Sequence, residues 1–415
     1  MASAMQAQKE LRRTNSKLGS SQYQPVPTSM HGEGASAPKS DLEGFASIFG
    51  DNKILTSLLI FVPLGFGAHL MHLGDTYVFT FNFLAIIPLA WLIGKSTEDV
   101  AARIGETAGG LLNATFGNVV EMLLCIAGIR NNEIGVVQCT LLGSILSNLL
   151  LVMGCAFLFG GLYFPIQTYN QAGAATQCSL MALSVFAIGL PTIYVNVLKQ
   201  ESEWEHMVEV SRWASVCLLC VYFAYLVFQL KTHAALFQDP AGEDGEEEEE
   251  PDLSPVTAAV MLLICTVVTS FATDALIEAI KGTITEWKVS KEFIGIILLP
   301  IIGNAAEHYT AIKVAMQNKM DLSLGVAAGS SCQMALLVTP FTVLVGWCYG
   351  TEMTLNFHAF QLAVLLFSVF LVNTILNNGQ SNWLEGYILL VTYFVVSLIY
   401  FFEGTEDETS LATID

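Results

Sequence analysis

Apolar residues along this chain come in long runs that charged residues do not interrupt. From Ile134 to Leu198 there is no Asp, Glu, Lys or Arg, and the same holds from Leu322 to Thr351. A helix needs about 20 apolar residues to cross a hydrocarbon core about 30 Å thick, so the first stretch alone can hold two spans. The runs lack the alternation of apolar and polar positions that a membrane-spanning barrel requires. The pattern therefore predicts an all-α polytopic membrane protein.

Eleven apolar segments are long enough for transmembrane helices. Their approximate cores are residues 54–73, 77–94, 107–129, 134–160, 174–198, 213–230, 256–280, 293–316, 322–348, 357–376 and 385–402. Residues 1–52 are rich in Ser, Gly, Gln and Pro, which predicts a disordered tail. An acidic loop over 232–255 separates the sixth span from the seventh, and a short acidic tail covers 404–415. The first apolar run begins only at Ile54, so we expect no cleavable signal peptide.

Composition agrees with a membrane protein. Hydrophobic residues make up 53% of the chain and charged residues 13%, about half the charged share of a typical soluble domain. The net charge of −20 comes largely from the block Asp239–Asp252 and from the tail after Glu403. The nine cysteines lie in apolar runs, where a free thiol packs as a small apolar group. Cys217 and Cys220 have CxxC spacing but no second ligand pair, so packing is favoured over zinc or redox chemistry.

The distribution of Lys and Arg in the loops predicts the orientation. With a cytosolic N-terminus, eleven of these residues fall on the cytosolic side and six on the opposite side. Because positive charge concentrates on the cytosolic side, this count favours a cytosolic N-terminus. Eleven spans would then place the C-terminus across the membrane.

The most informative feature is an internal repeat at a constant offset of 186 residues. The segment GGLLNATFGNVVEM, Gly109–Met122, aligns without a gap on GIILLPIIGNAAEH, Gly295–His308. Both copies contain Gly-Asn-x-x-Glu, and Gly-Ser follows at the same distance. The matched pairs are Gly109/Gly295, Gly117/Gly303, Asn118/Asn304, Glu121/Glu307, Asn132/Asn318, Gly143/Gly329, Ser144/Ser330, Leu150/Leu336, Leu151/Leu337 and Val152/Val338.

The two copies fall in the third and eighth expected spans, five spans apart. An odd offset means that they enter the membrane in opposite senses. Such inverted repeats are typical of secondary transporters, whose sites form near the midplane where the repeats meet. We therefore expect a leading helix and a first five-helix repeat within 53–231, and a second, inverted five-helix repeat within 256–403.

Each repeat carries one carboxylate near the middle of a span, Glu121 or Glu307. Because a carboxylate at that depth costs several kcal/mol, it suggests a function by default. Asn118 and Asn304 precede the glutamates by three residues, so each offers an amide oxygen on the same helix face. A glycine before each Asn lets backbones approach and lets carbonyls turn toward an ion. The alternative is that each glutamate is structural and satisfied by a neighbouring polar group, and the symmetry of the pair argues against it.

The chemistry of this set favours a divalent cation. Carboxylate, amide and backbone oxygens are hard ligands that suit Ca²⁺, with Mn²⁺ as the second candidate. Two negative charges match one divalent cation, and without the cation they repel each other, which favours protonation. The same pair can therefore hold either Ca²⁺ or protons, which is the physical basis of exchange.

Further polar side chains on the following spans could complete the ligand shell or could be interhelical hydrogen bonds, and the sequence leaves both open. These side chains are Ser144, Ser147, Asn148, Ser330, Ser331 and Gln333. Gln138, near the start of the fourth span, is a weaker candidate ligand.

Three other polar positions in the expected spans each allow more than one interpretation. Glu98 and Asp274 close the second and seventh spans and could line the entrances to the site, although interfacial carboxylates are often only solvated. His308 could shuttle protons, but it points about 100° away from Glu307 around the helix, which favours packing. Asn113 begins a glycosylation sequon that lies within a span, so we discard that motif.

The two motifs GNVVE (Gly117–Glu121) and GNAAEH (Gly303–His308) resemble the cation/proton exchanger family of the wider cation/Ca²⁺ exchanger group. LLGSILSNLLLVMG and AAGSSCQMALLVTPF, which follow them, extend the resemblance over residues 54–402, most closely to fungal vacuolar Ca²⁺/H⁺ exchangers. The resemblance implies eleven spans and an ion site at Glu121 and Glu307, with Asn118 and Asn304 beside them.

The resemblance also implies a location and a direction of transport. It indicates a multi-pass protein of the vacuolar membrane that loads cytosolic Ca²⁺ into an acidic compartment. The acidic loop lies where that family has a Ca²⁺-attracting or regulatory stretch, and a solvated linker is an equal alternative.

Three other functions compete with proton-coupled exchange. A Na⁺-coupled Ca²⁺ exchanger would need sites for several monovalent ions, of which one glutamate pair gives no clear sign. A Ca²⁺-permeable channel would select cations with carboxylate rings, and the inverted repeat argues against it. A membrane metalloprotease lacks its His-Glu-x-x-His motif, so we expect a transporter and no enzyme. We expect no cofactor and no nucleic-acid partner, only the bilayer and the transported Ca²⁺ and H⁺.

Overall fold

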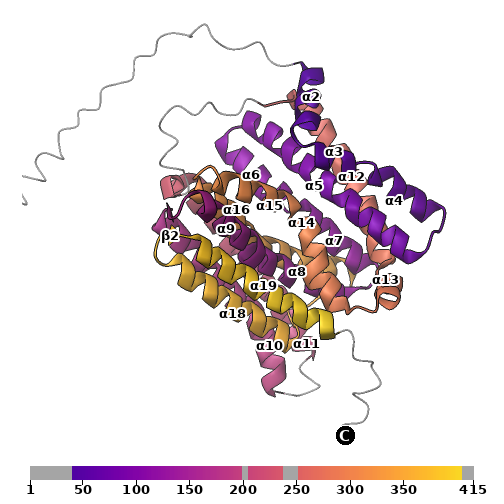
Figure 1. Cartoon of the computed structure of the whole chain (residues 1–415). Helices are drawn as coiled ribbons and strands as arrows, with labels where there is room; N and C mark the ends of the chain where they lie inside the picture. Colours follow the sequence, from indigo (N-terminus) through magenta and orange to yellow (C-terminus); the bar gives the residue numbers. More distant parts are fainter. Residues whose placement is uncertain (1–39, 199–203, 237–250, 404–415) are drawn as a thin grey trace, which may run out of the picture. The chain divides into compact units, whose positions relative to one another are not determined.

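The computed structural model describes residues 40–198, 204–236 and 251–403, and the chain over these ranges is almost entirely helical (Figure 1). The acidic tail after residue 403, most of the acidic loop and residues 1–39 lie outside them.

Nine helices of these ranges are long and apolar enough to cross a membrane, and there are eleven spans if each of two bent helix pairs counts as one. The first four of the nine are α3–α4 (Lys53–Leu58, Phe61–Leu70), α5 (Asp75–Ile104), α8–η1–α9 (Ile134–Leu146, Ser147–Val152, Met153–Tyr163) and α10 (Gln171–Leu198). The other five are α11–η3 (Trp204–Val227, Phe228–Thr232), α12 (Pro255–Glu278), α16–η7–α17 (Met320–Gln333, Met334–Val338, Thr339–Tyr349), α18 (Ala359–Leu376) and α19 (Trp383–Glu403). The prediction of an all-α polytopic membrane protein is confirmed.

The two bent pairs are the repeated motifs. Helix α6 (Glu106–Phe116) meets α7 (Val119–Arg130) at a bend of 45°. The segment η6–α14 (Phe293–Leu298, Leu299–Gly303) meets α15 (Ala305–Ala315) at 58°. Each break falls at the Gly-Asn of a repeat, where the sequence predicted an unbroken span.

The repeat is visible elsewhere in the backbone. Asn132 and Asn318, equivalent by the 186-residue offset, both adopt left-handed conformations with φ of 57° and 64°. Asn tolerates this region better than most residues, so both broken spans turn into the next helix in the same way. The π-helical segments η1 and η7 also occupy equivalent positions.

Two segments form helices that the sequence analysis did not predict. Residues 41–51, assigned to a disordered tail, form α2 (Asp41–Asp51), so that assignment is wrong for this part of the tail. The physical reason is a capping box, in which Ser40 Oγ accepts from the Glu43 amide and Glu43 accepts from the Ser40 amide. The second is α13 (Ile280–Trp287), beyond the end of α12. Shorter elements are η4 (Ala234–Leu236) and the antiparallel strands β1 (Gln167–Thr168) and β2 (Gln380–Ser381).

Packed apolar side chains form two clusters. One joins α5 and α12, equivalent helices of the two repeats that lie side by side, to α2 and α4 (Figure 1). The other joins α8–α11 to α16–α19. Side chains of α7 and α14 enter the first cluster and those of α15 enter the second. The bent pairs therefore lie where the clusters meet, which places both motifs inside the protein.

The two ends of the helical bundle can be told apart by their contacts. We call the end where α5 finishes and α12 begins the loop face, because the acidic loop joins α12 there. We call the end where α7 finishes beside α12 the far face. Arg130 on α7 contacts Asp274 there through Nη1 and Oδ2 at 2.9 Å.

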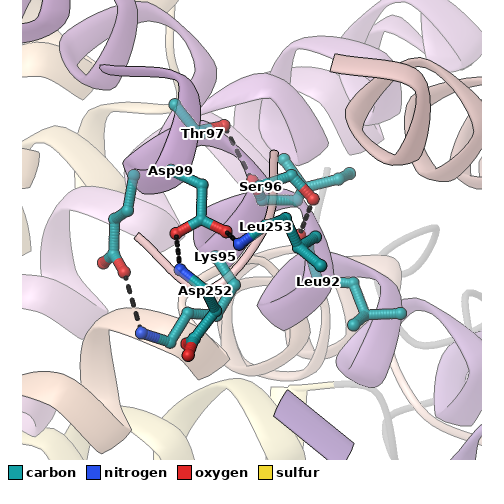
Figure 2. A network of polar contacts seen from close by, with 9 residues as sticks. Leu92, Lys95, Ser96, Thr97, Asp99, Asp252 and Leu253 are labelled. Carbon is teal, nitrogen blue, oxygen red and sulfur yellow. Dashed lines mark hydrogen bonds and ion pairs between the residues drawn. The ribbon is translucent and has the colours of Figure 1, made fainter. Parts of the chain in front are cut away.

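A polar network fixes the start of α12 at the loop face (Figure 2). The Asp99 carboxylate accepts from the amides of Asp252 at 3.3 Å and Leu253 at 3.1 Å. Arg103 donates to the Leu253 carbonyl at 3.0 Å. Asp41 of α2 accepts from Ser254 and Thr257, so α2, α5 and α12 are held together at this face.

Candidate functional site

The helix breaks bring the two predicted carboxylates into the middle of the protein. Glu121 lies in the first turn of α7, and Glu307 lies in the first turn of α15. The Glu121 carboxylate lies against the break of the other repeat, because a Cβ built on Gly303 would be only 2.7 Å from Glu121 Oε1. A side chain at position 303 would therefore displace the Glu121 carboxylate from its present position.

Both carboxylates have buried oxygens that no described protein group satisfies. Glu121 is 1% exposed, and neither of its carboxylate oxygens has a hydrogen-bond partner among the described residues. Glu307 Oε2 is also buried and has no hydrogen-bond partner among the described residues. Buried polar atoms are nearly always paired, and an unpaired carboxylate is among the most costly exceptions. A cation or protons could satisfy these oxygens.

The two asparagines link the repeats. Asn118 Nδ2 donates to Gln333 Oε1 at 2.5 Å, and Asn304 Nδ2 donates to the Ser144 carbonyl at 3.2 Å. Both bonds cross from one repeat to the other. Since the nitrogen is occupied, the carbonyl oxygen is the atom that each amide can offer a cation.

A cavity of about 360 Å³ reaches the site from the loop face. Glu98, Gly110 and Leu230 lie along it nearer the loop face, and it extends to Glu307 and Gln333. Glu121 is not among the described residues that line it. The two equivalent glutamates are therefore in different surroundings, one beside the cavity and the other sealed.

The predicted entrance residues lie at opposite faces. Glu98 borders the cavity with a side chain 59% exposed, and Lys95 Nζ is 3.4 Å from its carboxylate. Asp274 lies at the far face, where it pairs with Arg130 and is separate from the described lining of the cavity.

The candidate ligands on α8 and η1 lie in the buried interior. Ser144, Ser147 and Asn148 are fully buried. In the part of the chain that the structure describes, no hydrogen-bond partner satisfies Ser144 Oγ or either side-chain atom of Asn148. Gln138 Nε2 instead donates to the carbonyls of Thr354 and Asn356, so it holds a loop.

The equivalent side chains of the second repeat have other surroundings. Ser330 borders the cavity, whereas Ser331 donates to the Ala327 carbonyl. His308 Nδ1 lies 3.0 Å from the Asn304 carbonyl, so its ring contacts its own helix break.

Several cavity residues were not candidate site residues in the sequence analysis, which considered Asn113 only as part of a discarded sequon. Asn113, Thr97, Thr310 and Gln229 all line the cavity. Asn113 could have been predicted as a site residue, because it lies one helical turn before Gly117 of the Gly-Asn motif and therefore on the same helix face. Within the described ranges no three His, Cys, Asp or Glu side chains cluster to hold a metal. Any cation here would depend on two carboxylates supplemented by amide, hydroxyl or backbone oxygens.

Comparison with known proteins decides the family. The sodium/calcium exchanger protein family matches residues 75–231 and 257–402, which include both bent pairs. The chain belongs to this family. A protein named Ca²⁺/H⁺ antiporter from Synechocystis is 43% identical over 371 residues, which cover 85% of this chain and 98% of that protein. The vacuolar calcium ion transporter of Schizosaccharomyces pombe is 42% identical, with 83% of this chain and 84% of that protein covered.

Solved structures share the fold. The structure of native YfkE is similar with a TM-score of 0.72 and 31% identity, and the similarity covers 84% of this chain and all of that chain. A second structure of the same protein is described as a Ca²⁺/H⁺ antiporter. A crystal structure of an H⁺/Ca²⁺ exchanger is similar at a TM-score of 0.63 and 12% identity, which supports the fold alone.

Proposed function

We propose that this family member is a secondary antiporter that exchanges Ca²⁺ for H⁺ through the carboxylates of Glu121 and Glu307. The observation that carries the proposal is a pair of carboxylates, one from each repeat, with buried and unsatisfied oxygens at the inner end of a cavity. The relatives named Ca²⁺/H⁺ antiporter, at about the same length, support the choice of ions.

The two glutamates have the charge that the exchange needs. With both ionised, they neutralise one Ca²⁺, and amide oxygens of Asn118 and Asn304 add hard ligands. With the cation gone, two unpaired buried charges are costly, so protons take its place. Because the ion and the protons compete for the same oxygens, each drives out the other. Ser144, Ser147 and Gln333 supply further oxygens to the same region.

The cavity supplies a route for the ion from the loop face. Glu98 borders it and adds negative charge, which raises the local concentration of cations. We place the loop face in the cytosol, in agreement with the distribution of Lys and Arg. The N-terminus is then cytosolic, and Ca²⁺, with Mn²⁺ as a second substrate, is loaded into an acidic compartment such as the vacuole. The S. pombe vacuolar calcium ion transporter supports that location.

Ca²⁺ movement against a proton gradient tests the proposal. The purified protein is reconstituted in vesicles with equal Ca²⁺ on both sides and the membrane potential clamped at zero. We expect net Ca²⁺ accumulation when the interior is acid and none when the pH is equal. An imposed Na⁺ gradient at equal pH is the control, because the family also contains sodium-coupled exchangers by its description. Accumulation driven by Na⁺ alone, or no accumulation with folded protein, would contradict proton coupling.

A further inference from the structure

The asparagines of the two motifs have unequal hydrogen bonds. Asn118 Nδ2 donates to two acceptors, the Ala114 carbonyl at 3.3 Å and Gln333 Oε1 at 2.5 Å. Asn304, its equivalent in the second repeat, donates to the Ser144 carbonyl at 3.2 Å. A side-chain amide nitrogen carries two N–H groups, so the described bonds use both at Asn118 and one at Asn304. Among the described residues, the bond to Gln333 therefore has no counterpart at Asn304.

The residue equivalent to Gln333 is too short to make that bond. The 186-residue offset carries Gln333 onto Ser147. A serine side chain lacks the methylene and the carbonyl carbon through which glutamine extends its oxygen. Ser147 is fully buried, and its Oγ has no hydrogen-bond partner among the described residues. The link that Gln333 makes between the repeats is therefore not made directly at Ser147.

A tyrosine of the last helix faces this serine. Helix α19 packs against η1, which begins at Ser147. The Tyr393 side chain is 6% exposed, and its hydroxyl is directed toward Ser147 Oγ. No hydrogen bond within the described part of the chain satisfies either hydroxyl. Because a buried tyrosine hydroxyl usually has a partner, the two groups call for a third one between them.

We propose that Ser147, Tyr393 and Asn304 hold a buried water molecule, and that this bridge makes Tyr393 a positioning residue for the ion site. The water oxygen takes the place of Gln333 Oε1. It accepts from the second N–H of Asn304 and from the Tyr393 hydroxyl, and it donates to Ser147 Oγ. Buried waters typically make about three such bonds to groups that otherwise lack a partner. The effect on ion binding, but not the water itself, rests on the proposed exchange.

The bridge fixes the amide of a proposed ion ligand. The Asn304 nitrogen is held by the Ser144 carbonyl and by the water, so its carbonyl oxygen remains for the cation. A group that is ordered before binding loses less conformational freedom when the ion arrives. Tyr393 acts through Asn304 and not on the ion. Its loss should therefore weaken Ca²⁺ binding without stopping exchange.

The Ca²⁺ affinity of the purified protein tests the bridge. Tyr393→Phe and Ser147→Ala each remove one hydroxyl, and we expect each to lower the equilibrium affinity about tenfold, the lower end of the usual effect of an outer-shell partner. The double variant should lose little more than either single variant, because both changes remove the same water. For Tyr393→Phe the maximal exchange rate at saturating Ca²⁺ should stay near that of the unmodified chain.

A longer side chain should replace the water. Ser147→Gln gives the first repeat the residue that the second repeat has, so its amide oxygen can reach Asn304 directly. We expect Ser147→Gln, added to Tyr393→Phe, to restore the Ca²⁺ affinity to within about twofold. Tyr400→Phe is the matched control, since Tyr400 is also a buried tyrosine of α19 whose hydroxyl has no partner among the described residues. It lies roughly 10 Å farther along the helix and should leave the affinity unchanged.

A high-resolution structure of the purified protein tests the water itself. We expect density within hydrogen-bonding distance of Ser147 Oγ and the Tyr393 hydroxyl, and none there in Ser147→Gln. If that density is missing, if Tyr393→Phe binds Ca²⁺ as tightly as the unmodified chain, or if Ser147→Gln restores nothing, the bridge is wrong and the exchange stands. If the density is present but the unmodified chain does not exchange Ca²⁺ for H⁺, the proposed substrates are wrong and the water site stands.

Discussion

A five-residue motif, Gly-Asn-x-x-Glu, builds each half of the proposed ion site. Glycine ends the first helical piece without a side chain, so Gly303 can touch the carboxylate of Glu121. Asparagine bonds the other repeat through its amide nitrogen, as Asn118 does with Gln333. The glutamate then lies in the first turn of the next helix. The sequence was sufficient to select these residues as candidates, because a carboxylate within an apolar span is costly and one occurs at the equivalent position of each repeat.

Replacement of either carboxylate by its neutral isostere tests the paired site. Glu121→Gln and Glu307→Gln keep the side-chain shape but leave one negative charge for a divalent cation. Loss of an outer-shell partner typically lowers metal affinity about 10–100-fold, so loss of a direct ligand should lower exchange by at least about 100-fold. The rate of Ca²⁺ uptake into vesicles with an acid interior measures this loss of exchange. Glu286→Gln, at an exposed position of α13, is the matched control and should transport normally, whereas near-native transport by either site variant would disprove the paired site.

The two predicted entrance carboxylates should behave differently. Glu98→Gln removes a charge beside the cavity and should weaken the apparent Ca²⁺ affinity from the loop face by about twofold at low salt, with no change in maximal rate. The effect should vanish at high ionic strength. Asp274→Asn is the comparison, because Asp274 lies at the other face and should leave loop-face affinity unchanged. Initial rates over a Ca²⁺ series show the difference, and complete inactivation by Glu98→Gln would place that carboxylate in the site itself.

Among the elements, α2 shows how a short polar signal can be missed beside strong apolar ones. Ser40 and Glu43 form a capping box that is legible in the sequence as Ser-x-x-Glu, yet the surrounding composition suggested disorder. The helix breaks were also missed, since apolar composition extends across both. The Gly-Asn pairs mark their positions, but a bend of 45° or 58° depends on how the other repeat packs against the break.

The docking of α2 on α12 should depend on the ionisation of Asp41. A hydrogen bond from Thr257, followed by bonds from the Ser254 amide and hydroxyl, lowers the pKa of Asp41 below its usual value. A lowered pKa in the folded state means that the contribution to docking is present above the unfolded value. It is lost as the pH falls through the folded value.

Hydrogen exchange of the α2 amides therefore measures this contact. We expect stronger protection at neutral pH, decreasing as the pH falls below the ordinary range of a carboxyl group. Asp41→Asn keeps an acceptor but cannot ionise, so its α2 protection should be lower at neutral pH and nearly independent of pH. Thr257→Val removes one donor and should weaken protection without removing the pH dependence. An unchanged profile for Asp41→Asn would show that other contacts hold α2.

At the scale of the whole molecule, the sequence predicted two equivalent repeats but not the difference between their surroundings. The 186-residue offset predicts two halves with equivalent glutamates. The structure makes them unequal, with Glu307 beside a cavity and Glu121 buried against Gly303 of the other repeat. The offset names equivalent positions but not which of them lies beside a cavity, because that depends on how the two halves pack against each other.

The inequality of the halves leads to a prediction about protons on the two sides. From the loop face, Ca²⁺ reaches the site only when both glutamates are ionised, so added protons should compete with it. We expect acidification of the loop-face solution to raise the Ca²⁺ concentration for half-maximal uptake by about tenfold per pH unit for each proton displaced, with the maximal rate unchanged. Initial uptake rates over a Ca²⁺ series at several external pH values measure this.

Acid on the opposite side should have the opposite effect. Protons that arrive from the opposite face displace Ca²⁺ from the same two carboxylates, so they should accelerate its release and increase the maximal rate. A channel shows no such difference, because Ca²⁺ would follow its own gradient whichever side is acid. Inhibition by protons from both faces, without competition by Ca²⁺, would mean that the protons act away from Glu121 and Glu307. If the same two carboxylates are exposed first to one solution and then to the other, protons in the loop-face solution should inhibit Ca²⁺ binding, and protons in the opposite solution should speed Ca²⁺ release.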